Sequence, residues 1–337
     1  MHAGLEPPPR AGKATIGHAG VRERFVRTLT AGRLASTYLF VGPRGVGKRT
    51  FAEELAGVLL CTGPVTADRL SRCGQCESCR LFDQGEAPDL LRVALPEGKS
   101  SLPLELFIGP KERRHREGLC HDLAVKPLLS SRRVAIIDDA DTLGAEGANA
   151  LLKTLEEPPP RAVILLIGTS LSRQLPTIRS RSQVIRFGAL TSDEVTQILA
   201  ERDLLPEEAD PGVLAARSGG SVSHALAAGD DSLEAFRAVL HRALASEPVD
   251  TVRFGAAVIG QSQAGSTEPA VRRERLRQIL AMAVDFYRTR LRDAAQANAF
   301  TAFDRLVERL DRTLSALEDL DRNANQATLV QAWLAEL

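Results

Sequence analysis

The sequence predicts an α/β fold in which a parallel sheet carries a phosphate-binding loop, followed by an all-helical C-terminal part. The first observation is the glycine-rich turn "GPRGVGK" (42–48), which stands between an apolar run and an amphipathic stretch. The second is a series of further apolar runs that alternate with helical patterns, as parallel sheets covered on both faces require. The third is that no convincing strand follows "LTSDEV" (190–195).

Each element has its own local signal. Val21, Phe25 and Leu29 recur at helical spacing, and an amphipathic helix is expected from about Thr50 to Leu60. The prolines after Glu157 end a helix whose apolar face carries Ala148, Leu151, Leu152 and Leu155. Buried strands are expected at "TYLFV" (37–41), "RRVAIIDDAD" (132–141), "AVILLIGTS" (162–170) and "QVIRFG" (183–188). Residues 85–130 give no clear pattern.

The C-terminal part is expected to be helical throughout. Thr191 and Glu194 have the spacing of a capping box, which opens a helix. Two apolar stripes predict the core of a helical bundle. The first consists of Leu276, Ile279, Leu280, Ala283 and Phe286, and the second of Phe303, Leu306, Val307, Leu310, Leu314 and Leu317. The stretch "SGGSVSHALAAGDD" (218–231) is interpreted as a hinge between two helical units.

Composition excludes several classes of protein. The 337 residues suit two or three domains, and 43 basic side chains balance 43 acidic ones. No overall field therefore attracts the chain to nucleic acid, and a DNA contact would need a local patch or a partner. No apolar run approaches the roughly 20 residues of a membrane span, and the N-terminal "MHAGLEPPPRAGKA" lacks the apolar segment of a signal peptide. We expect a flexible leader over residues 1–14 and a cytoplasmic location.

The glycine-rich turn has the residues of a phosphate-binding loop except at one position. Gly42, Gly45 and Gly47 allow backbone N–H groups to converge on phosphate oxygens, and Lys48 adds a positive charge. The pattern requires Ser or Thr next, as a magnesium ligand, but Arg49 has only donors and a positive charge. Thr50 lies about 100° further round the helix and should point elsewhere. We interpret the loop as one that binds ATP or ADP weakly or not at all, with active hydrolysis as the alternative.

A second departure concerns the acids after the strand at 132–141. An acid at such a strand tip can help to hold magnesium, and a following Glu commonly polarises the attacking water. Here the pair is Asp138 and Asp139, and the shorter Asp139 draws its carboxylate back by about 1 Å. The two departures together argue against turnover.

Four of the five cysteines crowd into one segment. Cys73, Cys76 and Cys79 form C-x-x-C-x-x-C, and Cys61 precedes them by twelve positions. Four thiolates make a closed tetrahedral site, which predicts structural Zn²⁺ rather than catalysis; free thiols are the alternative. Cys120 stands apart and is expected to be a buried small hydrophobe. The basic stretch "PKERRHRE" (110–117) either touches DNA phosphates or is the solvated face of a helix.

The order of "GPRGVGK", "CGQCESC", "VAIIDDAD", "NALLKTLEEPP" and "LPTIRSRSQ" resembles the bacterial DNA polymerase III clamp-loader subunits of the AAA+ class. The resemblance covers roughly residues 15–228. It implies an AAA+ nucleotide-fold domain at 15–189 with a zinc module at 61–80, a helical lid at 190–228 and a helical collar at 229–337. The loop and strand-end acids then correspond to degenerate Walker A and Walker B motifs.

The resemblance also assigns roles to single residues. The family's "SRC" motif, which carries an arginine finger, matches Ser180, Arg181 and Ser182, so Arg181 would reach into a neighbour's nucleotide site; Arg179 is a weaker substitute. Thr169 stands at the sensor-1 position. Motor subunits resemble "GSLRDAL" in the lid, whereas this chain has Ser223 where the arginine belongs.

Groups that serve the chain's own nucleotide are therefore altered while the group that serves a neighbour remains, and this pattern resembles the delta-prime type, whose chains also end soon after the collar. The expected role is a stator without intrinsic ATPase activity in the DNA polymerase III holoenzyme. The implied partners are gamma/tau-type ATPase subunits and the delta subunit in a hetero-pentamer, the sliding clamp, and primed DNA through the complex, with no membrane. The alternatives are a gamma/tau-like ATPase and a DNA-binding zinc protein on a decayed AAA+ scaffold.

Overall fold

The computed structural model of the chain forms two compact units, Met1–Ala225 and Leu226–Leu337. It describes residues 15–63, 70–96, 99, 101–202, 204–205, 209–228, 231–246, 248, 250–264, 269–296, 300–321 and 325–337. The expected leader at 1–14, residues 64–69 of the expected zinc module and residues 229–230 of the expected hinge lie outside this description. The expected division into nucleotide-fold domain, lid and collar stays a prediction.

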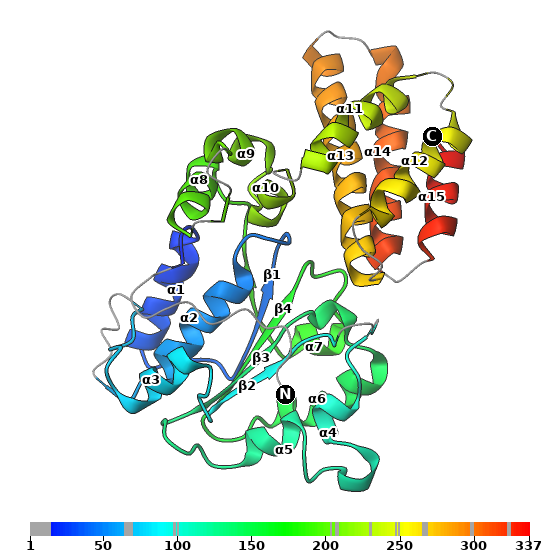
Figure 1. The fold of residues 1–337 in the computed structure, drawn as a ribbon. Helices are drawn as coiled ribbons and strands as arrows, with labels where there is room; N and C mark the ends of the chain where they lie inside the picture. The colour runs from blue at the N-terminus through cyan, green and yellow to red at the C-terminus, as the bar shows by residue number, and fades with distance from the viewer. Residues whose placement is uncertain are drawn as a thin grey trace. The chain divides into compact units, whose positions relative to one another are not determined.

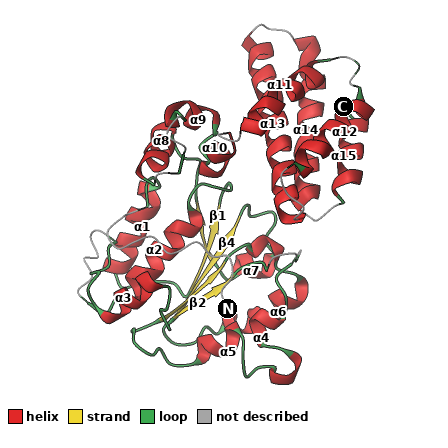
Figure 2. Cartoon of the chain, in the orientation of Figure 1, coloured by secondary structure: helices red, strands yellow, loops and turns green. Residues whose placement is uncertain are grey.

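The first unit is built on a parallel five-stranded sheet (Figures 1 and 2). Its strand order is β2-β3-β4-β1-β5. The strands are β1 (Thr37–Val41), β2 (Leu90–Val93), β3 (Arg133–Ile137), β4 (Ala162–Gly168) and β5 (Gln183–Arg186). The order places the carboxyl ends of β1, β3 and β4 together at one edge of the sheet, which is where an α/β fold binds its ligands.

Helices cover both faces of the sheet, as the alternating pattern predicts (Figure 1). One face carries α1 (Ala19–Thr30), α2 (Lys48–Leu60) and α3 (Glu77–Gln84), and its core is rich in aromatic residues. In that core Phe40 and Phe51 contact each other, and both contact Phe25 and Phe187. The other face carries α4 (Glu105–Ile108), α5 (Leu119–Ala124), α6 (Ala145–Glu156) and α7 (Pro176–Ser180), packed on an aliphatic core. Both faces of β1, β3 and β4 are therefore buried.

The basic stretch at 110–117 is not the face of a helix. Only the single 3-10 turn η1 (Lys111–Arg113) is helical there, and a second such turn, η2 (Ala140–Thr142), follows β3. Gly109 and Gly118 pack so closely that a Cβ on Gly118 would lie 2.5 Å from the Gly109 nitrogen. The stretch between them is a closed loop with exposed side chains, and this geometry corrects the helical alternative.

The first unit continues into α8 (Ser192–Glu201), α9 (Pro211–Arg217) and α10 (Val222–Ala228), the last of which crosses the boundary between the units. The predicted capping box at the start of α8 is confirmed, since the Thr191 hydroxyl accepts from the Glu194 N–H and the Glu194 carboxylate accepts from the Thr191 N–H.

The second unit consists, in its described residues, of helices only (Figure 2). They are α11 (Asp231–Ala245), α12 (Thr251–Gln263), α13 (Pro269–Gln296), α14 (Phe300–Asp321) and α15 (Gln326–Ala335). The first predicted stripe forms the core, because four of its residues are fully buried in α13 and Phe286 packs against them.

The second predicted stripe is wrong in part. Val307 and Leu314 of α14 are 43% and 36% exposed, while Thr313, Ala316 and Leu320 are buried. The buried face of α14 therefore lies to one side of the predicted one. No helix among the described residues has both the length and the apolar character needed to cross a membrane.

Candidate functional site

The glycine-rich turn joins β1 to α2, as predicted, and its lysine faces inward. Gly45 and Gly47 adopt φ values of 71° and 94°, which an L side chain rarely does. Lys48 is 8% exposed, and its Nζ donates to the carbonyls of Gly42 (2.8 Å) and Pro43 (2.6 Å). Burial, together with repulsion from Arg44, lowers the pKa of Lys48 to about 8. The ammonium is thus held by its own loop.

Arg49 pairs with the acid at the tip of β3. Its Nε lies 3.7 Å from Asp138 Oδ2, and the two side chains are 32% and 21% exposed. Arg49 thus sets a positive charge of the chain itself beside the carboxylate that a magnesium ion would need. Thr50, one position on, is half-buried in the first turn of α2.

The two acids after β3 differ in their surroundings. Burial and the neighbouring Asp139 carboxylate raise the pKa of Asp138, and Arg49 and Lys48 partly offset this rise. The Asp139 N–H donates to Asp138 Oδ1 at 3.0 Å, and Asp139 itself has a left-handed backbone with φ 52°. The backbone direction changes at Asp139, so its shorter side chain is not the only feature that sets where its carboxylate lies.

A third acid, Asp141, which was not among the predicted site residues, joins β4 to this edge of the sheet. Asp141 Oδ2 accepts from the Thr169 N–H at 2.6 Å, and Oδ1 accepts from Nε2 of the buried Gln174. The Thr169 carbonyl in turn accepts from the Gly42 N–H at 3.1 Å. Thr169, the predicted sensor-1 residue, is therefore tied to the glycine-rich turn and to the segment after β3, and the run of acids "DDAD" was the available signal.

The start of α10 contacts the loop from the other side. The Val222 N–H donates to the Gly45 carbonyl at 2.9 Å. A Cβ on Gly45 would lie 2.4 Å from Ser221 Oγ and 2.5 Å from Ser223 Oγ. Ser223 thus packs directly on the loop, and a long side chain at this position would need another course.

Arg181 is folded against its own domain. It follows α7, and its Nη2 donates to Glu156 Oε1, at the end of α6, at 2.5 Å. Its Nη1 lies 3.2 Å from both the Thr177 carbonyl and Ser180 Oγ. Arg179 is exposed, and no side-chain partner is found for it among the residues that the structure describes.

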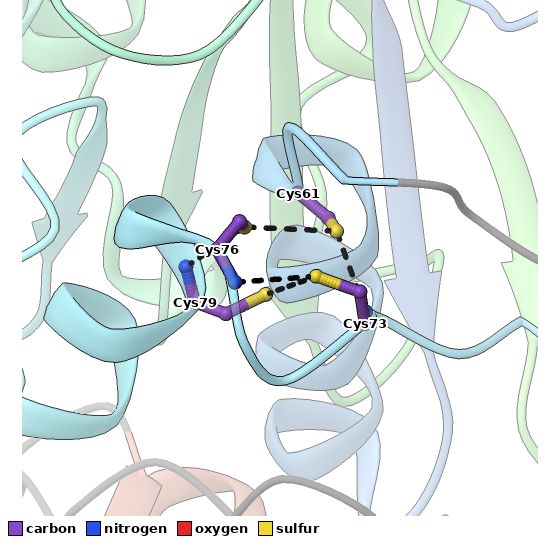
Figure 3. A group of neighbouring side chains, drawn as sticks. All are labelled: Cys61, Cys73, Cys76 and Cys79. Carbon is purple, nitrogen blue, oxygen red and sulfur yellow. Dashed lines mark hydrogen bonds between the residues drawn. The ribbon is translucent and has the colours of Figure 1, made fainter.

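The four clustered cysteines come together as predicted (Figure 3). Their Sγ atoms all lie within 4.8 Å of one another, with 4.0 Å between Cys61 and Cys76 and between Cys73 and Cys79. Zinc–sulfur bonds of about 2.3 Å in a tetrahedron give sulfur–sulfur distances of about 3.8 Å, so the donor set fits the metal. The N–H groups of Cys73, Cys76 and Cys79 each donate to the Sγ of another member at 3.4 Å, which favours thiolates.

The cysteine cluster is attached to the C-terminal end of α2. The carbonyl of Leu60, the last residue of that helix, accepts from the hydroxyls of Ser78 (2.7 Å) and Ser130 (2.8 Å). Ser130 belongs to a loop whose N–H groups at 128–130 all donate to the buried Asp89 carboxylate. The cluster, the loop before β3 and the phosphate-binding helix thus form one connected assembly. Cys120 lies apart, half-buried, with its thiol donating to the Ala150 carbonyl.

Comparison with known proteins finds relatives among the subunits of DNA polymerase III. The sequence model of the family described as "DNA polymerase III, delta subunit" matches residues 17–191. DNA polymerase III subunit tau/gamma of Haemophilus influenzae is 32% identical over 230 residues, which are 67% of this chain and 31% of that protein. DNA polymerase III subunit delta' of Pseudomonas aeruginosa is 37% identical over 147 residues, or 44% of this chain and 41% of that protein.

The chain thus spans less than half the length of these curated relatives. Among solved structures, a DNA polymerase III gamma subunit-related protein of Thermotoga maritima has 17% identity and a TM-score of 0.37, covering 92% of this chain and 97% of that one. The RuvB Holliday junction branch migration motor of the same organism has 17% identity and a TM-score of 0.40, covering 84% and 80%. Scores this low carry no further conclusion.

Proposed function

This chain belongs to the DNA polymerase III delta-subunit family and is a clamp-loader subunit, and we propose that it is the delta-prime-like stator, which does not hydrolyse nucleotide itself. In this proposal Arg181 acts in trans on the ATP of a neighbouring gamma/tau-type subunit. The chain assembles with those subunits and a delta subunit, and the complex loads a sliding clamp on primed DNA in the cytoplasm.

The ion pair between Arg49 and Asp138 is the observation that carries the proposal. A magnesium ion between the β- and γ-phosphates needs a hydroxyl ligand at position 49 and a free acid at the tip of β3. Here the guanidinium of Arg49 replaces the hydroxyl, and the Asp138 carboxylate is paired with that guanidinium. The charges of Arg49 and Asp138 already neutralise each other, so a magnesium ion would have to displace the Arg49 guanidinium from the Asp138 carboxylate.

The contact of α10 with the loop supports the same conclusion. The Gly45 carbonyl is bonded to the Val222 N–H, and the Lys48 ammonium is bonded to two loop carbonyls. A nucleotide would have to break these bonds or bind around them. Ser223 has neither the charge nor the length to contact a γ-phosphate, so this position offers a nucleotide nothing in return.

Arg181 has the properties that a finger needs. Guanidinium remains charged at any physiological pH and binds phosphate oxygens through several N–H groups at once. The residue follows α7 at the surface, and the acceptors that hold it, among the described residues, belong to exposed residues. The role rests on the match of "SRS" to the family motif and stays a proposal.

The four cysteines complete the proposal with one structural Zn²⁺ per chain. Cys61, Cys73, Cys76 and Cys79 would hold the ion, which supplies a cross-link between α2 and α3 and no open coordination position. The metal would thus hold residues 73–79 against the C-terminal end of α2.

One observation favours a second candidate, a gamma/tau-like ATPase. The tau/gamma relative matches a larger share of this chain than the delta' relative does. Lys48 and Thr169 are also retained at the positions where such an enzyme uses them. This candidate requires that Arg49 move away from Asp138 when magnesium and nucleotide bind.

Nucleotide turnover distinguishes the two candidates. The stator predicts no Mg²⁺-dependent ATP hydrolysis by the isolated chain, and a rate that disappears in Lys48→Ala would establish the ATPase instead. In a loader reconstituted from the organism's own subunits, Arg181→Ala should abolish hydrolysis at the site it serves with assembly intact, because a finger contributes roughly 10³–10⁵ in rate. Arg179→Ala is the matched control, and the finger assignment fails if the two variants behave alike.

A further inference from the structure

The Arg181–Glu156 contact is made entirely within one domain. The Arg181 guanidinium binds three oxygen atoms at once: Oε1 of Glu156, the Thr177 carbonyl and Ser180 Oγ. Glu156 is the last residue of α6, and Arg181 directly follows α7, which packs against α6. We propose that Glu156 holds Arg181 in a self-bound position, from which a neighbour's triphosphate must displace it before Arg181 can act. This inference rests on the proposed function of Arg181.

The two ligands compete for the same N–H groups. A guanidinium has five donors and no acceptor, so whatever binds it must offer oxygen atoms. Glu156, the Thr177 carbonyl and the Ser180 hydroxyl together present an oxygen-rich surface, as a polyphosphate does. Because the Nη1 and Nη2 groups bound here also bind phosphate oxygens, Glu156 and a phosphate compete for them.

The position of Glu156 explains why it favours a cation. The C-terminal end of a helix carries partial negative charge, which disfavours a carboxylate there. α6 ends with Glu156 and is followed at once by Glu157, so two carboxylates gather at this unfavourable end. Arg181 relieves the repulsion for Glu156. Glu157 is exposed, and the structure gives it no ion pair among the described residues.

The contact is weak enough to be reversible. The Arg181 and Glu156 side chains are 32% and 49% exposed, and exposed ion pairs of this kind typically shift an equilibrium by about 1.5- to 5-fold. A self-bound population of this size lowers the fraction of subunits whose finger is free and lowers the observed rate in proportion. Glu156 is therefore a positioning residue: it sets how often the finger is available and takes no part in the reaction.

The test uses Glu156→Gln in the reconstituted loader, with Glu157→Gln as the matched control. Glutamine has nearly the helix propensity of glutamate, and the substitution removes a charge from the wrong end of α6, so the variant should fold. We expect the ATP hydrolysis stimulated by clamp and primed DNA to rise about 1.5- to 5-fold at saturating ATP, and Glu157→Gln to leave it unchanged. Raising the salt concentration should reduce the difference, because salt screens an exposed pair.

A double variant distinguishes this role of Glu156 from a purely structural one. In an Arg181→Ala background, Glu156→Gln must have no effect on the rate, because the carboxylate then has nothing to hold. A Glu156→Gln rate equal to that of Glu157→Gln, or lower than wild type, overturns the inference while leaving the finger assignment intact. If Arg181→Ala itself leaves hydrolysis unchanged, it is the finger assignment that fails.

Discussion

At residue 49 a guanidinium stands where a hydroxyl would serve magnesium, and one substitution can reverse both of its effects. Arg49 both removes a ligand and pairs with Asp138 at 3.7 Å. Replacing it with threonine restores the hydroxyl and frees the acid at the same time. Asp139 and Ser223 would remain as they are, so the substitution tests binding and not catalysis.

We predict that Arg49→Thr gains magnesium-dependent nucleotide binding without gaining turnover. The affinity for ADP, measured by calorimetry, should be roughly ten- to hundredfold higher with Mg²⁺ than with a chelator, the scale of one or two contacts to a charged group. Wild type should show no such difference. Arg44→Thr is the control, since it removes a positive charge from the same loop without placing a hydroxyl next to Lys48. Equal magnesium dependence in the two variants would contradict the role given to position 49.

At the scale of residues, the chemistry within a motif can be predicted from the sequence, whereas contacts between motifs cannot. The altered position 49 is visible because the loop pattern is contiguous. The pairing of Arg49 with Asp138 is not visible, because it depends on β1, β4 and β3 lying side by side in that order. The same holds for Asp141 with Thr169 and for Arg181 with Glu156, whose partners lie on different elements.

At the scale of elements, the cysteine cluster links α2 to α3, which also share a buried core through Phe82. Cys61 follows α2 directly, and Cys76 caps the start of α3. Ser78 and Ser130 close the α2 end by binding the Leu60 carbonyl. A metal at the cluster would fix this arrangement, so its loss should be felt in the stability of the whole first unit.

We predict about one Zn²⁺ per purified chain, lost in Cys73→Ser. The variant should unfold at a temperature lower by more than about 4 °C, the shift that roughly 1–2 kcal/mol produces in a unit of this size. Elemental analysis gives the metal content, and a thermal melt gives the midpoint. Cys120→Ser serves as the control and should keep its zinc, because that thiol lies apart from the cluster. A wild-type chain that holds no zinc would refute the cluster's proposed role.

Strands that are buried on both faces of the sheet are readily predicted from the sequence. β1, β3 and β4 are buried on both faces, so they read as unbroken apolar runs. β2 was not predicted, because it has only four residues and includes Arg92, whose charge is balanced by the buried Glu53 at 2.9 Å. That ion pair joins β2 to α2 and cannot be inferred from either segment alone.

For the whole molecule, the sequence predicts a helical C-terminal part and the covered side of α13, but not the covered side of α14. Val307 and Leu314, seven residues apart on α14, belong to an apolar stripe that the fold of the isolated chain leaves partly exposed. Exposed charged residues flank them, among them Glu308, which pairs with Arg312. An apolar centre with a polar rim is typical of a surface that contacts another protein.

If the chain is a clamp-loader stator, this face of α14 should contact a neighbouring subunit. We predict that Val307→Glu weakens co-assembly with the other loader subunits roughly tenfold or more, because a charge at the centre of an apolar contact is left without a partner. The isolated variant should unfold within about 0.5 kcal/mol of wild type, since Val307 is 43% exposed. Val252→Glu is the matched control: that valine, on α12, is 83% exposed and carries no neighbouring stripe. Sedimentation of the complex reconstituted with each variant measures co-assembly. If Val307→Glu assembles as well as Val252→Glu does, this face of α14 is excluded as the contact surface.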